Sequence, residues 1–217
     1  MDKLFTISYF VFLFLLIRVT FLNHSKYRLL IKILTCSHFL GLGIYAALTR
    51  DISLMKYLLV IGLILSFIGD VFLGLKDYFK SAFIIGVSAF SLAQLYYLLY
   101  LQLYHFNYFA FILALLFMGV FWFYIKRNPK IEFPSKAYFL IVYLFLLSST
   151  FFSSVFYFTE YSSELNFILM IGCILFFLSD LTLFHVYFLK KKNNYLKIAY
   201  LVLYHLAQIL IATFIYL

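Results

Sequence analysis

Residues 54–75 read LMKYLLVIGLILSFIGDVFLGL, and this stretch decides the fold. An α-helix needs about 20 apolar residues to cross a hydrocarbon core of about 30 Å, and this apolar run is long enough. One carboxylate, Asp70, stands inside it. A carboxylate within a span costs roughly 2.5–3.5 kcal/mol on insertion scales, so it is expected to face the interior of a helix bundle. The stretch therefore predicts a transmembrane helix with a polar residue that needs a function or a partner.

The composition of the whole chain agrees with a membrane protein. Of the 217 residues, 66% are hydrophobic and 12% are charged, and the mean hydropathy is +1.05. Soluble domains are roughly half apolar and a quarter charged, so lipid must be the solvent of this chain. Continuous apolar runs and the scarcity of Pro and Gly argue against a transmembrane barrel. We predict a single integral membrane domain over residues 1–217, all-α and polytopic.

Eight apolar runs carry this prediction. They cover approximately residues 4–22, 29–48, 54–75, 81–101, 107–125, 137–158, 165–189 and 195–217. The first run resembles a signal peptide, but it lacks a small-x-small cleavage site and continues past Arg18. It is therefore predicted to be the first of eight transmembrane helices.

The basic residues predict the orientation. When the runs are threaded in order, three of the 17 Lys and Arg residues fall on one side of the membrane and fourteen on the other. The positive-inside rule then places the basic connections in the cytoplasm and both termini outside, with a bacterial inner membrane as the expected location. Because these residues lie between apolar runs and not on an aromatic-interleaved polar face, we expect lipid and no nucleic acid as the partner. The oligomeric state stays open.

An internal repeat relates the two halves of the chain. Residues 62–73 (GLILSFIGDVFL) align without gaps on residues 172–183 (GCILFFLSDLTL), with six identities in twelve positions that include Asp70 and Asp180. Residues 90–95 (FSLAQL) likewise match residues 204–209 (YHLAQI). We predict a duplication of about residues 1–106 and 107–217. Each half holds an even number of spans, so the two four-helix repeats are parallel and the two aspartates should lie at similar depth.

Two interpretations of the aspartates follow. In the structural one, each carboxyl is neutral or pairs with Lys32, Arg18 or a tyrosine hydroxyl and sets the helix register. In the functional one, both line a shared polar cavity in which burial and like charge keep one protonated and the other ionised. One aspartate would then act as an acid, and the other as a base or as a stabiliser of a cation.

Other polar residues in the spans could support such a site. Serines could contact the carboxyls, Lys32 could snorkel or balance an aspartate or a substrate phosphate, tyrosines could orient a carboxyl or water, and the two glutamines could pair between helices. These candidates are Lys32, Ser66, Gln94, Tyr143, Ser179, Tyr204 and Gln208. A catalytic serine is not expected, because no Gly-x-Ser-x-Gly elbow is present.

The cysteines and histidines do not predict a metal centre. Cys36 and Cys173 fall inside apolar runs without CxxC spacing, so we expect buried small apolar residues and no disulfide. His38, His185 and His205 occupy three different spans, and no His-x-x-x-His spacing occurs. A site of three histidines stays open on this pattern alone, but no metal and no cofactor are predicted.

Several ordered motifs resemble the YhhN family of lysoplasmalogenases. They are SFIGDVFL at 66–73, FIIG at 83–86, FSLAQLY at 90–96, LFFLSD at 175–180 and YHLAQILI at 204–211. The resemblance extends across nearly the whole chain. It implies eight spans, two catalytic aspartates matching Asp70 and Asp180, and hydrolysis of the vinyl-ether bond of lysoplasmalogens to a fatty aldehyde and a glycerophospho-ethanolamine or -choline. The family usually has Ala-His where this chain has Ala93-Gln94, and Lys-Pro where it has Lys32-Ile33.

The implied chemistry suits two carboxyls. Vinyl-ether cleavage needs a proton on the enol-ether carbon and stabilisation of an oxocarbenium ion while water attacks, which resembles the requirement that glycoside hydrolases meet with two carboxyls. The lysophospholipid substrate would enter laterally with its single chain among aromatic side chains. Two other functions remain open on the sequence: a transporter that relays protons or binds a cation through the paired aspartates, and a membrane scaffold without turnover.

Overall fold

The apolar runs form helices along the chain, because a backbone in lipid must satisfy its N–H and C=O groups within its own segment. The structure is a computed structural model that describes residues 3–22, 25–79, 81–133, 138–191 and 193–217. These residues contain the helices α1 (Lys3–Phe21), α2 (Ser25–Thr49), α3 (Lys56–Gly74), α4 (Ala82–Tyr104), α5 (Tyr108–Arg127), α6 (Tyr138–Glu160), α7 (Glu164–Phe188) and α8 (Asn194–Tyr216). All eight are long and apolar enough to cross a membrane. The predicted all-α, multi-pass fold is confirmed.

Polar side chains mark where three of the helices begin. The side-chain oxygens of Asn107, Ser163 and Asn193 accept hydrogen bonds from backbone N–H groups in the first turns of α5, α7 and α8. Asn and Ser are favoured at this position, because they satisfy an N–H group that has no partner within the helix. At the other end of α5, Ile131 and Leu189 form an isolated β-bridge that ties the α5–α6 connection to the end of α7.

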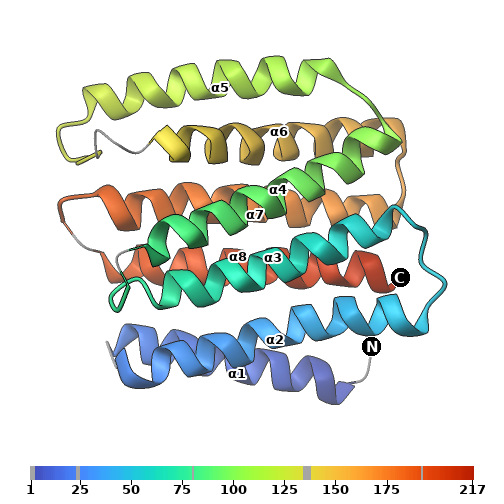
Figure 1. The fold of residues 1–217 in the computed structure, drawn as a ribbon, viewed down its shortest axis with the longest axis horizontal. Helices are drawn as coiled ribbons and strands as arrows, with labels where there is room; N and C mark the ends of the chain where they lie inside the picture. Colours follow the sequence, from blue (N-terminus) through green and yellow to red (C-terminus); the bar gives the residue numbers. More distant parts are fainter. Residues whose placement is uncertain (1–2, 23–24, 80, 134–137, 192) are drawn as a thin grey trace.

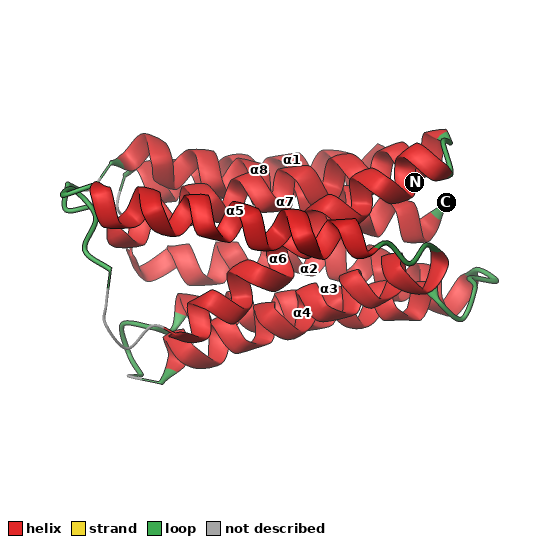
Figure 2. Ribbon diagram, turned by 90° about the horizontal axis from the view of Figure 1, so that it is seen from above, coloured by secondary structure: helices red, strands yellow, loops and turns green. Residues whose placement is uncertain are grey.

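The helices form two flanks around a centre. The α1/α2 hairpin lies on one side and the α5/α6 hairpin on the opposite side, with α3, α4, α7 and α8 between them (Figure 1). The α3–α4 and α7–α8 pairs share the most extensive contacts. Seen from above, α1 begins and α8 ends at the same end of the bundle (Figure 2). The centre therefore consists of the two hairpins that carry the repeated motifs.

The opposite end, where α1, α3, α5 and α7 finish, is called the basic end. Its described basic residues include Arg28, Lys76, Arg127 and Lys190. Lys80, Lys136 and Lys192, which the sequence predicts on the same side, lie outside the described residues. The side of the membrane that the basic end faces stays a prediction.

Glycines bring the central helices close together at equivalent places. A Cβ atom added at Gly62 of α3 would collide with the ring of Tyr97 in α4, and one at Gly172 of α7 would lie 3.0 Å from Ile211 of α8. The sequence repeat equates Gly62 with Gly172, and its second match, continued by two residues at the same offset, places Tyr97 opposite Ile211. Both hairpins therefore pack through the same pair of positions, although the duplication itself stays a prediction.

Aromatic rings join the two central hairpins. Phe90 and Tyr97 of α4 pack edge-to-face against Phe176 of α7, with ring centroids 6.3 Å apart in both pairs. Tyr204 of α8 packs against Phe176 and Phe90 at 5.5 Å and 6.0 Å. Such tilted contacts are the favoured geometry of aromatic pairs. They restrict the position of the Tyr204 side chain, whose hydroxyl reaches the candidate site.

Helix α5 is held more loosely than the central helices. Among the described helices its backbone packs only against α6, and it reaches α7 through the ring pairs Phe117–Phe177 and Phe121–Phe184. Its outer face exposes Leu116 and Val120, as expected of a surface in contact with lipid. The separation between the backbones of α5 and α7 leaves room for the apolar chamber described below.

Candidate functional site

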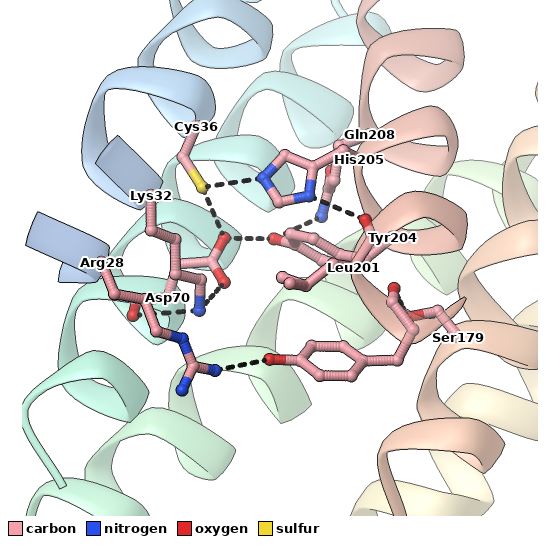
Figure 3. A network of polar contacts seen from close by, with 10 residues as sticks. Arg28, Lys32, Cys36, Asp70, Ser179, Leu201, Tyr204, His205 and Gln208 are labelled. Atoms are coloured by element: carbon pink, nitrogen blue, oxygen red, sulfur yellow. Dashed lines mark hydrogen bonds and ion pairs between the residues drawn. The ribbon is translucent and has the colours of Figure 1, made fainter. Parts of the chain in front are cut away.

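Asp70 is a buried carboxylate with a full set of partners (Figure 3). It lies near the end of α3 and is 4% exposed. Lys32 of α2 forms an ion pair with it, with Nζ 2.8 Å from Oδ1. The hydroxyl of Tyr204 in α8 donates a hydrogen bond to Oδ2 at 2.5 Å. Three helices thus meet at this one side chain, which needs an opposite charge because burial removes its water.

A chain of hydrogen bonds extends inward from Tyr204. Gln208 donates from Nε2 to the Tyr204 hydroxyl at 3.1 Å, and the Tyr97 hydroxyl donates to Gln208 Oε1 at 3.2 Å. The hydroxyl oxygens of Ser66 and Tyr97 are 3.4 Å apart. Each polar side chain in this hydrogen-bond network has a partner. The network therefore holds Tyr204 in the orientation in which its hydroxyl meets Asp70.

Cys36 and His205 complete the surroundings of Asp70. The Cys36 thiol donates to Asp70 Oδ2 at 3.2 Å, and its sulfur lies 3.7 Å from Nε2 of His205. Both Cys36 and Cys173 are free and buried, which confirms the expectation of buried cysteines without a disulfide. Cys36 is nevertheless more than an apolar residue, because it contacts a charged group.

Asp180 has a different environment. It lies on α7 and is half-buried. The hydroxyl of Tyr143 in α6 donates a short hydrogen bond to its Oδ2. Among the described residues, no Lys, Arg or His forms an ion pair with Asp180. Its carboxyl is therefore oriented by one neutral group and otherwise faces a cavity.

A polar cavity of about 760 Å³ opens at the basic end and contains both aspartates in its wall. Basic side chains from α2 and from the connection after α3 also line it, namely Arg28, Lys32 and Lys76. Tyr187, Tyr200 and Tyr204 contribute hydroxyl-bearing rings. Asp70 and Asp180 thus share a cavity large enough for a small polar group.

An apolar chamber of about 380 Å³ adjoins this cavity between α4, α5, α6 and α7. Phenylalanine and leucine side chains form most of its wall, together with Trp122 and Tyr143. Five residues line both spaces: Leu73, Phe90, Asp180, Leu183 and Tyr187. Asp180 is the carboxyl among them, so it stands where the polar and the apolar spaces meet.

The structure gathers most of the predicted supporting residues around the aspartates. Lys32 and Tyr204 contact Asp70, Tyr143 contacts Asp180, and Gln208 acts through Tyr204. The Ser66 hydroxyl lies near that of Tyr97, and in the described part of the chain it forms no hydrogen bond with the Asp70 carboxyl, although it lies on the same helix face. Ser179 donates to the backbone O of Tyr200 at 3.0 Å and thereby joins α7 to α8.

Gln94 is the exception, because it lies apart from both aspartates. It is buried in α4 but lines neither cavity, and its Nε2 has no hydrogen-bond partner among the described residues. The hydroxyl of Thr150 in α6 donates to its backbone O at 3.2 Å. The repeat equates Gln94 with Gln208, but the ring four residues earlier differs: the site residue Tyr204 corresponds to Phe90, which has no hydroxyl for Gln94 to reach.

Four residues of the site were not identified from the sequence. Thr20, Arg28 and Tyr200 line the polar cavity, and Cys36 contacts Asp70. Arg28 was interpreted as a topology signal, Cys36 as an apolar residue, and Tyr200 as one of 20 tyrosines. Only the spacing of Arg28, Lys32 and Cys36 at intervals of four residues, on one face of a helix, could have indicated their common side.

The histidines are separated in space. His38 lies 3.1 Å from Ser8, His185 lies 2.9 Å from the hydroxyl of Tyr124, and His205 lies beside Cys36. The described residues contain no group of three His, Cys, Asp or Glu side chains that could hold a metal ion. The three-histidine arrangement that the sequence left open is therefore not formed.

Comparison with known proteins gives one informative match. The model of the YhhN family matches residues 27–215, which include both aspartates and every supporting residue predicted from the sequence. Searches of curated proteins and of solved structures gave no match.

Proposed function

The chain belongs to the YhhN family, and on that premise we propose that it is a membrane-embedded hydrolase of the vinyl-ether bond of a lysoplasmalogen or a related lysolipid. The family is associated with lysoplasmalogenase activity. One observation supports the proposal most directly. Asp180, a carboxyl without a described ion-pair partner, lies at the junction of a polar cavity and an apolar chamber.

A single-chain lipid has the same division into polar and apolar parts as the two spaces. Its head group fits the polar cavity with Arg28 and Lys32, and its chain fits the apolar chamber. Trp122 and Ile141 line the chamber and are also exposed on the outer surfaces of α5 and α6. The alkenyl chain of the lipid can therefore enter sideways from the membrane. The ether linkage between this alkenyl chain and the glycerol then lies near Asp180.

The reaction consumes one water molecule. Asp180 gives its proton to the alkenyl carbon that does not carry the oxygen, and positive charge develops on the oxygen-bearing carbon as an oxocarbenium ion. Water adds to that carbon and returns a proton to the Asp180 carboxylate. The resulting hemiacetal breaks its bond to the glycerol oxygen, which yields a fatty aldehyde and a free glycerol hydroxyl.

The neighbours of the aspartates have distinct roles in this scheme. Tyr143 donates to Oδ2 of Asp180 and positions the carboxyl, so that its second oxygen can face the alkenyl carbon. Asp70, held in place by its ion pair with Lys32, puts carboxylate oxygens on the wall of the same cavity. Although Lys32 balances the net charge, fixed carboxylate oxygens favour a positive transition state over the neutral substrate, which is the requirement for catalysis.

The test is aldehyde release by purified protein in detergent with a defined lysoplasmenylethanolamine. The wild-type protein is expected to release aldehyde and glycerophosphoethanolamine, and Asp180→Asn is expected to lower kcat by about 10²–10⁴-fold, the usual contribution of a general acid. Asp70→Asn should also lose activity. Asp51→Asn is the matched control, because Asp51 is an exposed carboxylate at the opposite end of the bundle.

Three outcomes would overturn the proposal. Retained turnover in both Asp70→Asn and Asp180→Asn would exclude the aspartate mechanism. In water labelled with heavy oxygen, label in the glycerol hydroxyl would show that water attacks the glycerol carbon and not the alkenyl carbon. Aspartate-dependent ion flux into proteoliposomes without lipid turnover would indicate a transporter instead.

A further inference from the structure

The cations of the polar cavity are not equivalent. Lys32 is balanced by Asp70 in an ion pair. Arg28, one turn earlier on α2, donates from Nη2 to the hydroxyl of Tyr200 at 3.2 Å (Figure 3). No described carboxylate lies within ion-pair distance of Arg28. The cavity wall therefore holds a guanidinium whose described partner is neutral.

A buried hydroxyl of the same cavity lacks a protein partner. Thr20, near the end of α1, is 2% exposed, and its Oγ1 has no hydrogen-bond partner among the described residues. It lines the polar cavity together with Arg28 and Tyr200. Leaving a buried hydroxyl unpaired costs about 1–3 kcal/mol, so this group is suited to bind what the cavity holds.

From these groups we propose that Arg28, Thr20 and Tyr200 form the subsite for the phosphodiester of the lysolipid head group. The inference rests on the proposed function and adds the residues that recognise the head. A guanidinium presents planar N–H donors that match the oxygens of a phosphate, and hydroxyl groups supply further donors. Tyr200, only 8% exposed, restrains the guanidinium on the cavity wall.

The subsite determines how the lipid lies. Arg28, Thr20 and Tyr200 belong to α2, α1 and α8, whereas the apolar chamber is lined by α4, α5, α6 and α7. When the phosphate lies at the Arg28 subsite and the alkenyl chain lies in the apolar chamber, the glycerol and its ether linkage lie between the two, beside Asp180. Arg28 is thus a positioning residue, and its loss should weaken binding of the phosphate-bearing lipid more than it slows the chemical step.

Binding is measured with a lipid that is not cleaved. The chain contains one tryptophan, Trp122, which lines the apolar chamber. Bromine atoms on a bound chain quench its fluorescence. The two probes are lysophosphatidylethanolamine and monoacylglycerol, each with the same brominated ester chain, titrated into protein in a non-ionic detergent. The wild-type protein is expected to bind the phosphate-bearing probe about tenfold or more tightly, as expected for charge-assisted hydrogen bonds.

Arg28→Gln should remove this preference and leave the affinity for monoacylglycerol unchanged, which also shows that the variant is folded. Arg127→Gln is the matched control: it removes a cation at the same end that lies over the Phe123 ring and lines neither cavity. Thr20→Val should reduce the preference by a smaller factor. An unchanged preference in Arg28→Gln, or an equal loss in Arg127→Gln, would overturn the proposal.

Glycerophosphoethanolamine, which lacks the chain, separates a lipid site from a site for soluble phosphate. Glycerophosphoethanolamine is expected to compete weakly with the brominated lysophosphatidylethanolamine, because the acyl chain of the probe supplies the rest of its affinity. This competition should disappear in Arg28→Gln. Competition as strong as that of the whole lipid would assign the subsite to a soluble phosphodiester and overturn the lipid proposal. Absence of aldehyde release by the wild-type protein refutes the hydrolase function separately, since the binding probes require no turnover.

Discussion

Asp70 and Asp180 occupy the same position in the sequence repeat but differ in their partners. Helix α2, which precedes the helix of Asp70, contributes a cation, Lys32. Helix α6, which precedes the helix of Asp180, contributes a neutral hydroxyl, that of Tyr143. The facing hairpin gives Tyr204 to Asp70, and the equivalent residue of the first half is Phe90, which lines the cavity beside Asp180 without a hydroxyl. Similar backbone positions thus carry one fully paired carboxylate and one that faces open space.

This difference teaches how related sites can take separate tasks. In the proposed mechanism, the carboxylate with an ion pair and two further donors is held in place as the anion. The carboxyl with one donor at the edge of the apolar chamber exchanges a proton with the substrate. Environments that differ in this way are how two acidic residues acquire an acid and an anion role.

The largest expected difference between the two aspartates is in the thermal stability of their Asn variants. Asp70→Asn leaves the ammonium of Lys32, which is 12% exposed, without a counter-charge. Breaking a buried pair costs about 3–5 kcal/mol, so the melting temperature in detergent should fall well below that of Asp180→Asn. The double variant Lys32→Met with Asp70→Asn should recover much of the loss, because removing both charges is often nearly neutral. Equal melting temperatures for the two single Asn variants would contradict the contrast.

The two tyrosines should separate stability from catalysis. Tyr143→Phe removes the only hydrogen bond that a described residue makes to the Asp180 carboxyl, and it is expected to lower kcat about tenfold with little change in melting temperature. Tyr204→Phe also deprives Gln208 of a partner, so it should lower the melting temperature more than Tyr143→Phe does. Both variants are measured for kcat and for thermal unfolding in the same detergent. The same pattern in both variants would show that the two environments are equivalent.

The smallest expected effect concerns chain length in the chamber beside Asp180. Gly119 lines this chamber, and no atom lies within 4 Å of a Cβ placed there. Gly119→Leu should lower kcat/KM about threefold to tenfold for long-chain lysoplasmalogens and leave short-chain ones unaffected, because overpacking costs about 1 kcal/mol where neighbours can shift. Gly41→Leu is the control, since Gly41 on α2 has the same free space but lines neither cavity. Equal effects on both chain lengths would show that the chamber does not hold the chain.

The sequence located the groups that are costly in lipid. Asp70, Asp180, Lys32 and Gln208 stand out in apolar runs, because each must find a partner or water inside the bundle. The sequence could not assign the partners. Cys36 was taken as apolar although it contacts Asp70, and Gln94 was named as a supporting candidate although it lines neither cavity.

The sequence by itself determined the membrane fold, the family and the two acidic positions. Helices in lipid must satisfy their own backbone hydrogen bonds, so the length and polarity of each run are enough to predict a span. Only the tertiary structure decided that Lys32 forms an ion pair with Asp70, that Asp180 stands between a polar cavity and an apolar chamber, and that Arg28 shares a wall with Thr20. These facts depend on which helix faces come together, and side-chain packing between distant segments is not encoded in the pattern of any one run.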